Sequence, residues 1–179
     1  MDPPDYLTHP ITMKNTFTVA LCLTFFFLVS TLPGKDIKIP EDSPVVSVNV
    51  PDSWGPEETD HGVAVESADK EATVFFEVTD AKGTDALLTE NIDWLKDQKV
   101  TINEASKSEK DFKTASMSWS RISWDGTSEE WGPATIGFAF ADVGNGKVLV
   151  VTYWVTKKGW EKHDGELTKI FDSVKKTKG

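Results

Sequence analysis

The chain has 179 residues, of which 39% are hydrophobic and 27% charged, a composition typical of one globular domain rather than of a disordered or repetitive chain. Its formal net charge of −10 argues against a nucleic-acid-binding protein, because contact with phosphates requires a basic face. One cysteine excludes an internal disulfide framework, and three histidines far apart in the sequence leave little for a histidine-based metal centre. The sequence contains no phosphate loop, dinucleotide fingerprint or zincin motif, so we expect neither a metal site nor a cofactor.

An uncharged apolar run occupies residues 17–32. It is shorter than the roughly 20 residues that a membrane-spanning helix needs, and it resembles the hydrophobic region of a signal peptide in length. Lys14 precedes the run, whereas residues 1–12 contain acidic residues and no base. We therefore predict that translation begins at Met13, that residues 13–34 are a signal peptide, and that residues 1–12 are a mis-assigned start or a disordered extension.

The predicted signal peptide determines the expected location. The chain's one cysteine is Cys22, so cleavage near residue 34 would leave a chain without thiols, which suits an oxidising compartment. We expect a periplasmic or secreted protein of a Gram-negative bacterium. The alternative is an uncleaved segment that anchors the protein in the inner membrane, with the domain facing the periplasm.

The first half of the remaining chain predicts a linker and three strands. Residues 35–43 are polar and contain a proline, which indicates a linker, and residues 44–179 then form a single α+β domain. Alternating valines predict a strand at residues 46–50, followed by a loop at residues 52–62. Further short strands are expected at residues 63–65 and 73–78, and the spacing indicates an antiparallel meander.

A helix and a second group of strands follow. Leu88, Ile92 and Leu95 form an apolar stripe on a helix of about four turns that begins at residue 84 or 85. Alternation predicts a strand at residues 111–124, a turn at 125–128 and a strand at 134–141.

The last part of the chain predicts a hairpin and a closing helix. Asn145-Gly146 is typical of a type I′ hairpin turn. Residues 148–155, which follow this turn, are apolar on both faces of the predicted strand, as expected of a central strand covered on both sides. Residues 160–174 carry the apolar pattern of a closing amphipathic helix.

The resulting order is β-β-β-α-β-β-β-α, and the domain opens with VSVNVPDSW, which places a P-x-x-W motif at Pro51 to Trp54. Together with the hairpins around Asp125 and Asn145 and the apolar closing helix, this order resembles the Mog1/PsbP-like superfamily, which includes small exported bacterial proteins. The resemblance implies an antiparallel sheet of about six strands with helices packed on it. It also implies a non-enzymatic role in binding other proteins, as in an extrinsic subunit of the oxygen-evolving photosystem and a nuclear GTPase partner.

Tryptophans are the most numerous candidate binding residues. Exposed tryptophan can stack on sugar rings or anchor a protein interface. The four that lie in predicted loops or at element ends are candidates for this role: Trp54, Trp124, Trp131 and Trp160. The other three lie in strong strand or helix patterns and are expected in the core: Trp94, Trp119 and Trp154.

Two further residue types complete the candidate surface. Arg121 is the only arginine, and it could stack on an aromatic ring, pair with a buried carboxylate as a structural cross-link, or anchor a ligand. His61 and His163 each adjoin an aspartate, which could orient a general base, although a solvated loop histidine is the simpler interpretation. No nucleophile motif accompanies them.

These patterns favour an exported, non-catalytic binding or accessory protein with a protein partner. One alternative is a small-ligand or carbohydrate-binding domain that uses loop tryptophans, and another is a hydrolase with an unrecognised site. Nucleic acid is not an expected partner, and contact with a membrane is expected only through an uncleaved signal segment. The candidate ligand or partner surface consists of Trp54, His61, Arg121, Trp124, Trp131 and Trp160.

Overall fold

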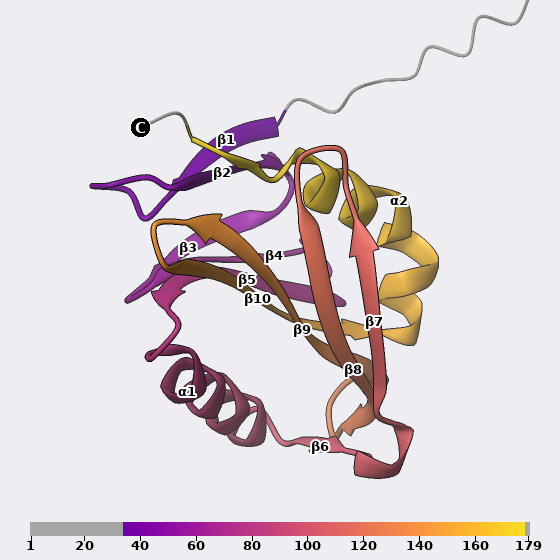
Figure 1. The fold of residues 1–179 in the computed structure, drawn as a ribbon. Helices are drawn as coiled ribbons and strands as arrows, with labels where there is room; N and C mark the ends of the chain where they lie inside the picture. Colours follow the sequence, from indigo (N-terminus) through magenta and orange to yellow (C-terminus); the bar gives the residue numbers. More distant parts are fainter. Residues whose placement is uncertain (1–33, 178–179) are drawn as a thin grey trace, which may run out of the picture. The chain divides into compact units, whose positions relative to one another are not determined.

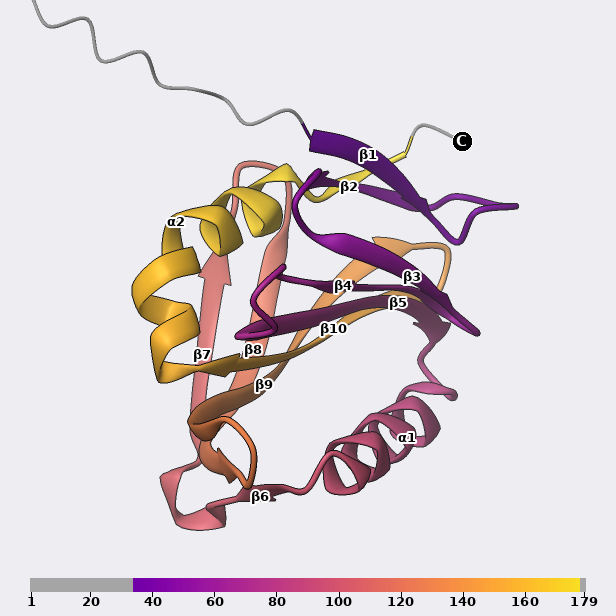
Figure 2. The same ribbon diagram turned by 180° about the vertical axis from the view of Figure 1, so that it is seen from behind.

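A computed structural model describes residues 34–177, and the predicted start and the apolar run at residues 17–32 lie outside them. The described residues form eleven strands, two α-helices and one short 3₁₀ turn, Glu104–Ser106 (Figures 1 and 2). The α+β class and the antiparallel sheet agree with the prediction, but the expected number of about six strands is wrong. Neither α-helix is long and apolar enough to cross a membrane.

The larger sheet has eight strands, all paired antiparallel, in the order β3-β4-β5-β10-β9-β8-β6, with β7 also paired to β8. As predicted, the most apolar strand, β10, lies in the middle of the sheet. The strands are β3 (Gly55–Thr59), β4 (Gly62–Glu66), β5 (Ala72–Asp80), β6 (Val100–Ile102), β7 (Ser108–Lys113), β8 (Ser118–Ser128), β9 (Gly132–Gly144) and β10 (Lys147–Thr156).

A smaller sheet joins the beginning and the end of the described chain. It contains β1 (Gly34–Ile39), β2 (Val46–Pro51) and β11 (Lys175–Lys176), with β2 in the centre. The prediction of a linker at residues 35–43 is therefore wrong over its first half. Ile37 pairs with Val48, and Ile39 is buried, so a two-residue apolar alternation inside a polar segment is enough to form a strand against β2.

The two α-helices cover opposite faces of the larger sheet (Figures 1 and 2). On one face, α1 (Thr84–Asp97) packs Leu95 against Ile136 and Trp154. On the other, α2 (Lys157–Ser173) inserts Leu167 and Ile170 into the main core. Alternate residues of β10 therefore reach different helices, which explains why this strand is apolar on both sides.

The buried face of α1 is rotated slightly from the predicted stripe. Leu87, Asn91 and Leu95 are buried, whereas Leu88 and Ile92 are only half-buried. The reason is a polar contact that apolar periodicity cannot reveal. The Asn91 amide donates to Glu77 Oε2 at 2.7 Å and to Thr152 Oγ1 at 2.9 Å, so this asparagine faces the sheet.

Two predicted turns have different outcomes. At Asn145-Gly146 both residues have positive φ, 54° and 71°, as predicted for a hairpin. The turn predicted at residues 125–128 is wrong, because these residues belong to β8 and pair with β9 as far as Ser128 opposite Gly132. Local turn propensity at Asp125-Gly126 is overridden by pairing with two neighbouring strands.

The strand predicted at residues 111–124 is also wrong in detail, because the chain reverses at residues 114–117 to form the β7–β8 hairpin. The loop predicted at residues 52–62 contains β3, which forms a hairpin with β4. Both missed strands lie at the edge of the sheet and expose most of their side chains. Their sequences consequently lack the alternation from which strands are predicted.

Candidate functional site

Trp54 is a core residue rather than part of a surface. Its side chain is 1% exposed, and its indole Nε1 donates to Glu166 Oε2 at 3.1 Å. The ring meets that of His163 edge-on, with 5.6 Å between the centroids. The tryptophan therefore holds α2 onto the start of β3 and is not available to a ligand.

His163 is bonded to carboxylates at both ring nitrogens. Nδ1 lies 2.9 Å from Glu166 Oε2, and Nε2 lies 3.0 Å from Asp69 Oδ1. Burial raises the pKa of Asp69, but hydrogen bonds, first of all from Lys162, together hold that pKa well below its usual range. Asp69 is thus ionised at neutral pH. Both ring nitrogens of His163 are occupied by carboxylates, so neither is free to act as a general base for a substrate.

His61 lies in the turn between β3 and β4, at the opposite end of β4 from Asp69. It is exposed, and its Nε2 is 3.9 Å from Glu90 Oε2, a distance at the limit of an ion pair. The structure therefore does not bring the two histidines into one site. Within residues 34–177, no three His, Cys, Asp or Glu side chains come together in a way that would hold a metal ion.

Trp124 and Trp131 lie on the α1 side of the sheet. Trp124 is half-buried and meets Phe138 edge-on at 6.0 Å. Trp131 follows β8 in the turn to β9 and packs against the cluster that contains Leu95 and Trp154. Neither tryptophan contributes to the site formed by the remaining two candidates.

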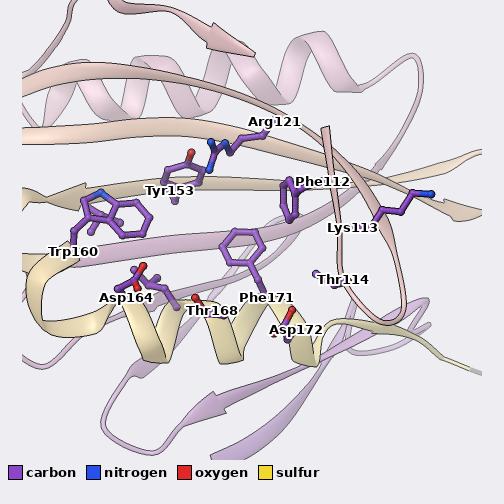
Figure 3. A pocket seen from close by; sticks show the side chains of 12 residues that line it. Phe112, Lys113, Thr114, Arg121, Tyr153, Trp160, Asp164, Thr168, Phe171 and Asp172 are labelled. Carbon is purple, nitrogen blue, oxygen red and sulfur yellow. The ribbon is translucent and has the colours of Figure 1, made fainter. Parts of the chain in front are cut away.

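Those two candidates, Arg121 and Trp160, line one cleft between α2 and the sheet (Figure 3). The cleft has a volume of about 270 Å³. Its walls come from β7, β8, β10 and α2, and four of its lining residues are aromatic. The lining consists of Phe112, Lys113, Thr114, Arg121, Tyr153, Val155, Trp160, Asp164, Leu167, Thr168, Phe171 and Asp172.

The aromatic wall is built by edge-to-face contacts. The Tyr153 ring lies 6.4 Å from both Trp160 and Phe171, at interplanar angles of 83° and 87°. Phe171 also meets Phe112, which stacks in parallel on the buried Trp119 at 5.8 Å. The rings therefore support one another and form a preorganised apolar wall.

Sequence patterns missed Tyr153, Phe112 and Phe171 as site residues. Tyr153 lies inside an apolar strand, and the two phenylalanines look like ordinary core positions. A phenol hydroxyl in the middle of a central strand is nevertheless a signal, because a buried hydroxyl needs a polar neighbour.

Arg121 supplies the cleft's buried polar group. Among the described residues its guanidinium forms no ion pair, and its buried Nε has no hydrogen-bond partner. Its cross-strand neighbours are Lys110 and Ala139, so neither adjacent strand places a carboxylate opposite it. Of the three alternatives for Arg121, pairing with a buried carboxylate is therefore wrong within the described residues.

Tyr153 lies next to this guanidinium (Figure 3). Burial raises the pKa of the phenol, while the Arg121 charge and a hydrogen bond with Ser123 act in the opposite direction. The phenol thus remains protonated at neutral pH. Together the two side chains offer N–H and O–H groups beside an apolar wall, which suits an anionic group attached to an apolar body.

Comparison with known proteins identifies the fold. No protein-family model and no curated protein sequence matches the chain. Among solved structures, the chain is similar to the solution structure of cyanobacterial PsbP (CyanoP) from Synechocystis sp. PCC 6803, with a TM-score of 0.54 and 6% sequence identity. The match covers 83% of this chain and 95% of the cyanobacterial one. The predicted order β-β-β-α-β-β-β-α is too short, because five strands precede α1 and five lie between α1 and α2. The resemblance to the family is nevertheless confirmed at the level of structure, and the domain has a PsbP-like fold.

Proposed function

We propose that this chain is an exported, non-catalytic binding protein whose cleft takes an apolar group that carries a carboxylate. The observation that carries the proposal is the Arg121 guanidinium, which lies without an acidic partner among aromatic rings. The partner we propose is a second protein that presents this chemistry at its C-terminal residue, where an apolar side chain and a carboxylate occur together.

The energetics of the arginine support an arriving anion. A partly buried cation without a partner is costly, and an incoming carboxylate would offset that cost with charge-assisted hydrogen bonds. Guanidinium geometry matches a carboxylate in a two-point contact. An unpaired Arg121 guanidinium therefore suits a binding site for a carboxylate.

The charges around the cleft fix the orientation of the ligand. Asp164 and Asp172 stand on the α2 side, opposite Arg121 and Tyr153 on the sheet side (Figure 3). An anion would be repelled from the helix and attracted to the sheet. The apolar body would then lie between Trp160 and Phe171, within a volume suited to one large side chain rather than to a folded element.

Support for binding rather than catalysis comes from the residue types. Among the described residues, the cleft lining contains no serine, cysteine or histidine. His163 lies on α2, the helix that forms one wall of the cleft, but both of its ring nitrogens are already bonded to carboxylates. The arrangement thus offers recognition groups without a nucleophile and base in contact.

The export part of the proposal depends on the apolar run at residues 17–32. It is tested by expressing the chain from Met13 in a Gram-negative host, then measuring intact mass and fractionating the cells. We expect a soluble periplasmic species that lacks the signal peptide. A full-length membrane-bound species would instead show that residues 17–32 are an anchor.

The binding part is tested with three probes and isothermal titration calorimetry: a pentapeptide ending in phenylalanine with a free carboxylate, its C-terminal amide, and N-acetyl-phenylalanine. We expect the free-carboxylate peptide to bind and the amide to bind at least tenfold more weakly. Arg121→Gln should weaken binding of the free peptide about 10- to 100-fold, the range expected for charge-assisted hydrogen bonds.

Lys110→Gln is the matched control, because it removes a neighbouring positive charge from outside the cleft lining. It should change the affinity less than about threefold, as expected for an exposed charge. Equal binding of peptide and amide would contradict the proposal. If N-acetyl-phenylalanine binds as tightly as the peptide, the source of the carboxylate is a small ligand rather than a protein terminus.

A further inference from the structure

A second hollow lies on the α1 side of the sheet and is lined by three tryptophans. Trp94 comes from α1, Trp131 from the turn after β8 and Trp154 from β10. The hollow has a volume of about 280 Å³. Six of its other lining residues are polar and come from several elements: Glu66, Lys70, Thr73, Gln98, Ser128 and Glu130.

The polar groups of this hollow are largely unused within the described chain. Lys70, Gln98 and Glu130 are exposed, and their side chains form neither an ion pair nor a hydrogen bond among residues 34–177. Trp154 is 7% exposed, and its buried indole Nε1–H has no acceptor in the same region. The hollow thus combines free donors with free acceptors.

The indoles are held at different depths. Trp154 is part of the core, in a cluster with Leu95 and Ile136, whereas Trp94 and Trp131 are half-buried at its margin. Trp94 is fixed by an edge-to-face contact with Phe75 at 4.7 Å between centroids. A ligand in the hollow would therefore meet a rigid aromatic surface that requires little ordering on binding.

We propose that this hollow is a saccharide-binding site for a neutral pyranose or disaccharide. A pyranose has an apolar C–H face that packs on an indole, and a rim of hydroxyls that both donate and accept hydrogen bonds. Tryptophan supplies the platform, and Gln98, Lys70 and Glu130 supply the complementary donors and acceptors.

The mixed rim favours a sugar over a cation. A quaternary ammonium ion is also recognised by aromatic rings with nearby carboxylates. It has no use for donors, however, and the Lys70 ammonium in the same rim would repel it. A neutral polyhydroxy ligand uses both kinds of group and suffers no such repulsion. The site is independent of the Arg121 cleft, which lies on the α2 side of the sheet.

The test is titration of the purified chain with cellobiose, maltose and N,N′-diacetylchitobiose, followed by calorimetry and by the indole N–H signals in ¹H–¹⁵N spectra. We expect at least one disaccharide to bind and to shift the Trp154 signal, assigned with Trp154→Phe. Trp131→Ala should weaken that binding at least tenfold, and Trp160→Ala, in the other cleft, should leave it within twofold.

Gln98→Ala keeps the test decisive if Trp131→Ala fails to fold, because Gln98 is exposed at the end of α1. This variant should weaken binding about three- to tenfold, as expected for a lost hydrogen bond. Binding of none of the three sugars would overturn the proposal. So would binding of choline in their absence, or sugar binding that both Trp131→Ala and Gln98→Ala leave unchanged.

Discussion

Tyr153 links the packing of the sheet to the chemistry of the cleft. Its ring lies directly over Gly137 of the neighbouring strand, its cross-strand partner. A Cβ atom at position 137 would overlap the phenol ring and its oxygen. The glycine therefore lets the tyrosine lie flat against β9, with its hydroxyl beside Arg121.

Gly137→Ala tests this packing, because it adds one methyl group at the position that the Tyr153 ring occupies. The added methyl should push the phenol ring away from β9 and lower the free energy of unfolding by about 1–3 kcal/mol, as overpacking of a core does. Urea unfolding followed by tryptophan fluorescence measures the change. In a Tyr153→Val background the same alanine should cost much less, because the overlapping ring is gone. A cost that is equal in both backgrounds would show that another contact is responsible.

At the scale of elements, the N-terminus of α2 is fastened to the start of β5. Thr156 caps the helix by accepting a hydrogen bond from the Gly159 N–H at 2.9 Å, and its hydroxyl donates to the buried carboxylate of Glu71. The Thr156 N–H also donates to the Glu71 carbonyl at 2.9 Å. This attachment sets where α2 leaves the sheet, and α2 carries Trp160 and Phe171 of the cleft.

Thr156→Val keeps the shape of the side chain and removes its hydroxyl. It should lower the free energy of unfolding by about 2–3 kcal/mol, because the helix loses its cap and the buried Glu71 carboxylate loses a donor. Thr156→Ser retains both hydrogen bonds and should cost less than about 1 kcal/mol. Urea unfolding of the two variants distinguishes the hydroxyl from the methyl, and equal costs would rule out the role of the cap.

At the scale of the whole molecule, sequence periodicity predicts those helices and strands that bury a row of apolar side chains in the core. The strands β2, β5, β9 and β10 and both α-helices follow from local alternation or helical spacing. The strands β1, β3 and β7 do not, because they lie at edges and expose most of their side chains. Their conformation is imposed by pairing with a neighbour.

The candidate site shows the same division. Arg121 and Trp160 stand out by residue type, but nothing local predicts that α2 brings them to one cleft with Tyr153. Trp54 fails as a surface candidate because its hydrogen-bond partner, Glu166, lies 112 residues further along the chain. Tertiary contacts at this range decide whether a tryptophan in a loop is exposed or buried.

The same long-range contacts predict how the molecule responds to acid. Asp69, in the turn between β4 and β5, binds Lys162 at 2.9 Å and His163 at 3.0 Å, and so ties this turn to α2. Its pKa is lower in the folded chain than the ordinary aspartate value of about 3.9. Unfolding below about pH 5 therefore takes up a proton that the folded state does not bind, so the contribution of Asp69 to stability falls as the pH falls.

Asp69→Asn should accordingly be less stable than the wild type at pH 7, and the difference should shrink as the pH falls from about 5 towards 2. Urea midpoints measured across this range check the prediction. Asp97→Asn is the control, because Asp97 is exposed at the end of α1 and forms no ion pair within residues 34–177. A constant difference between wild type and Asp69→Asn at every pH would mean that the carboxylate contributes through shape or hydrogen bonding alone, and that its charge does not hold α2 to the turn.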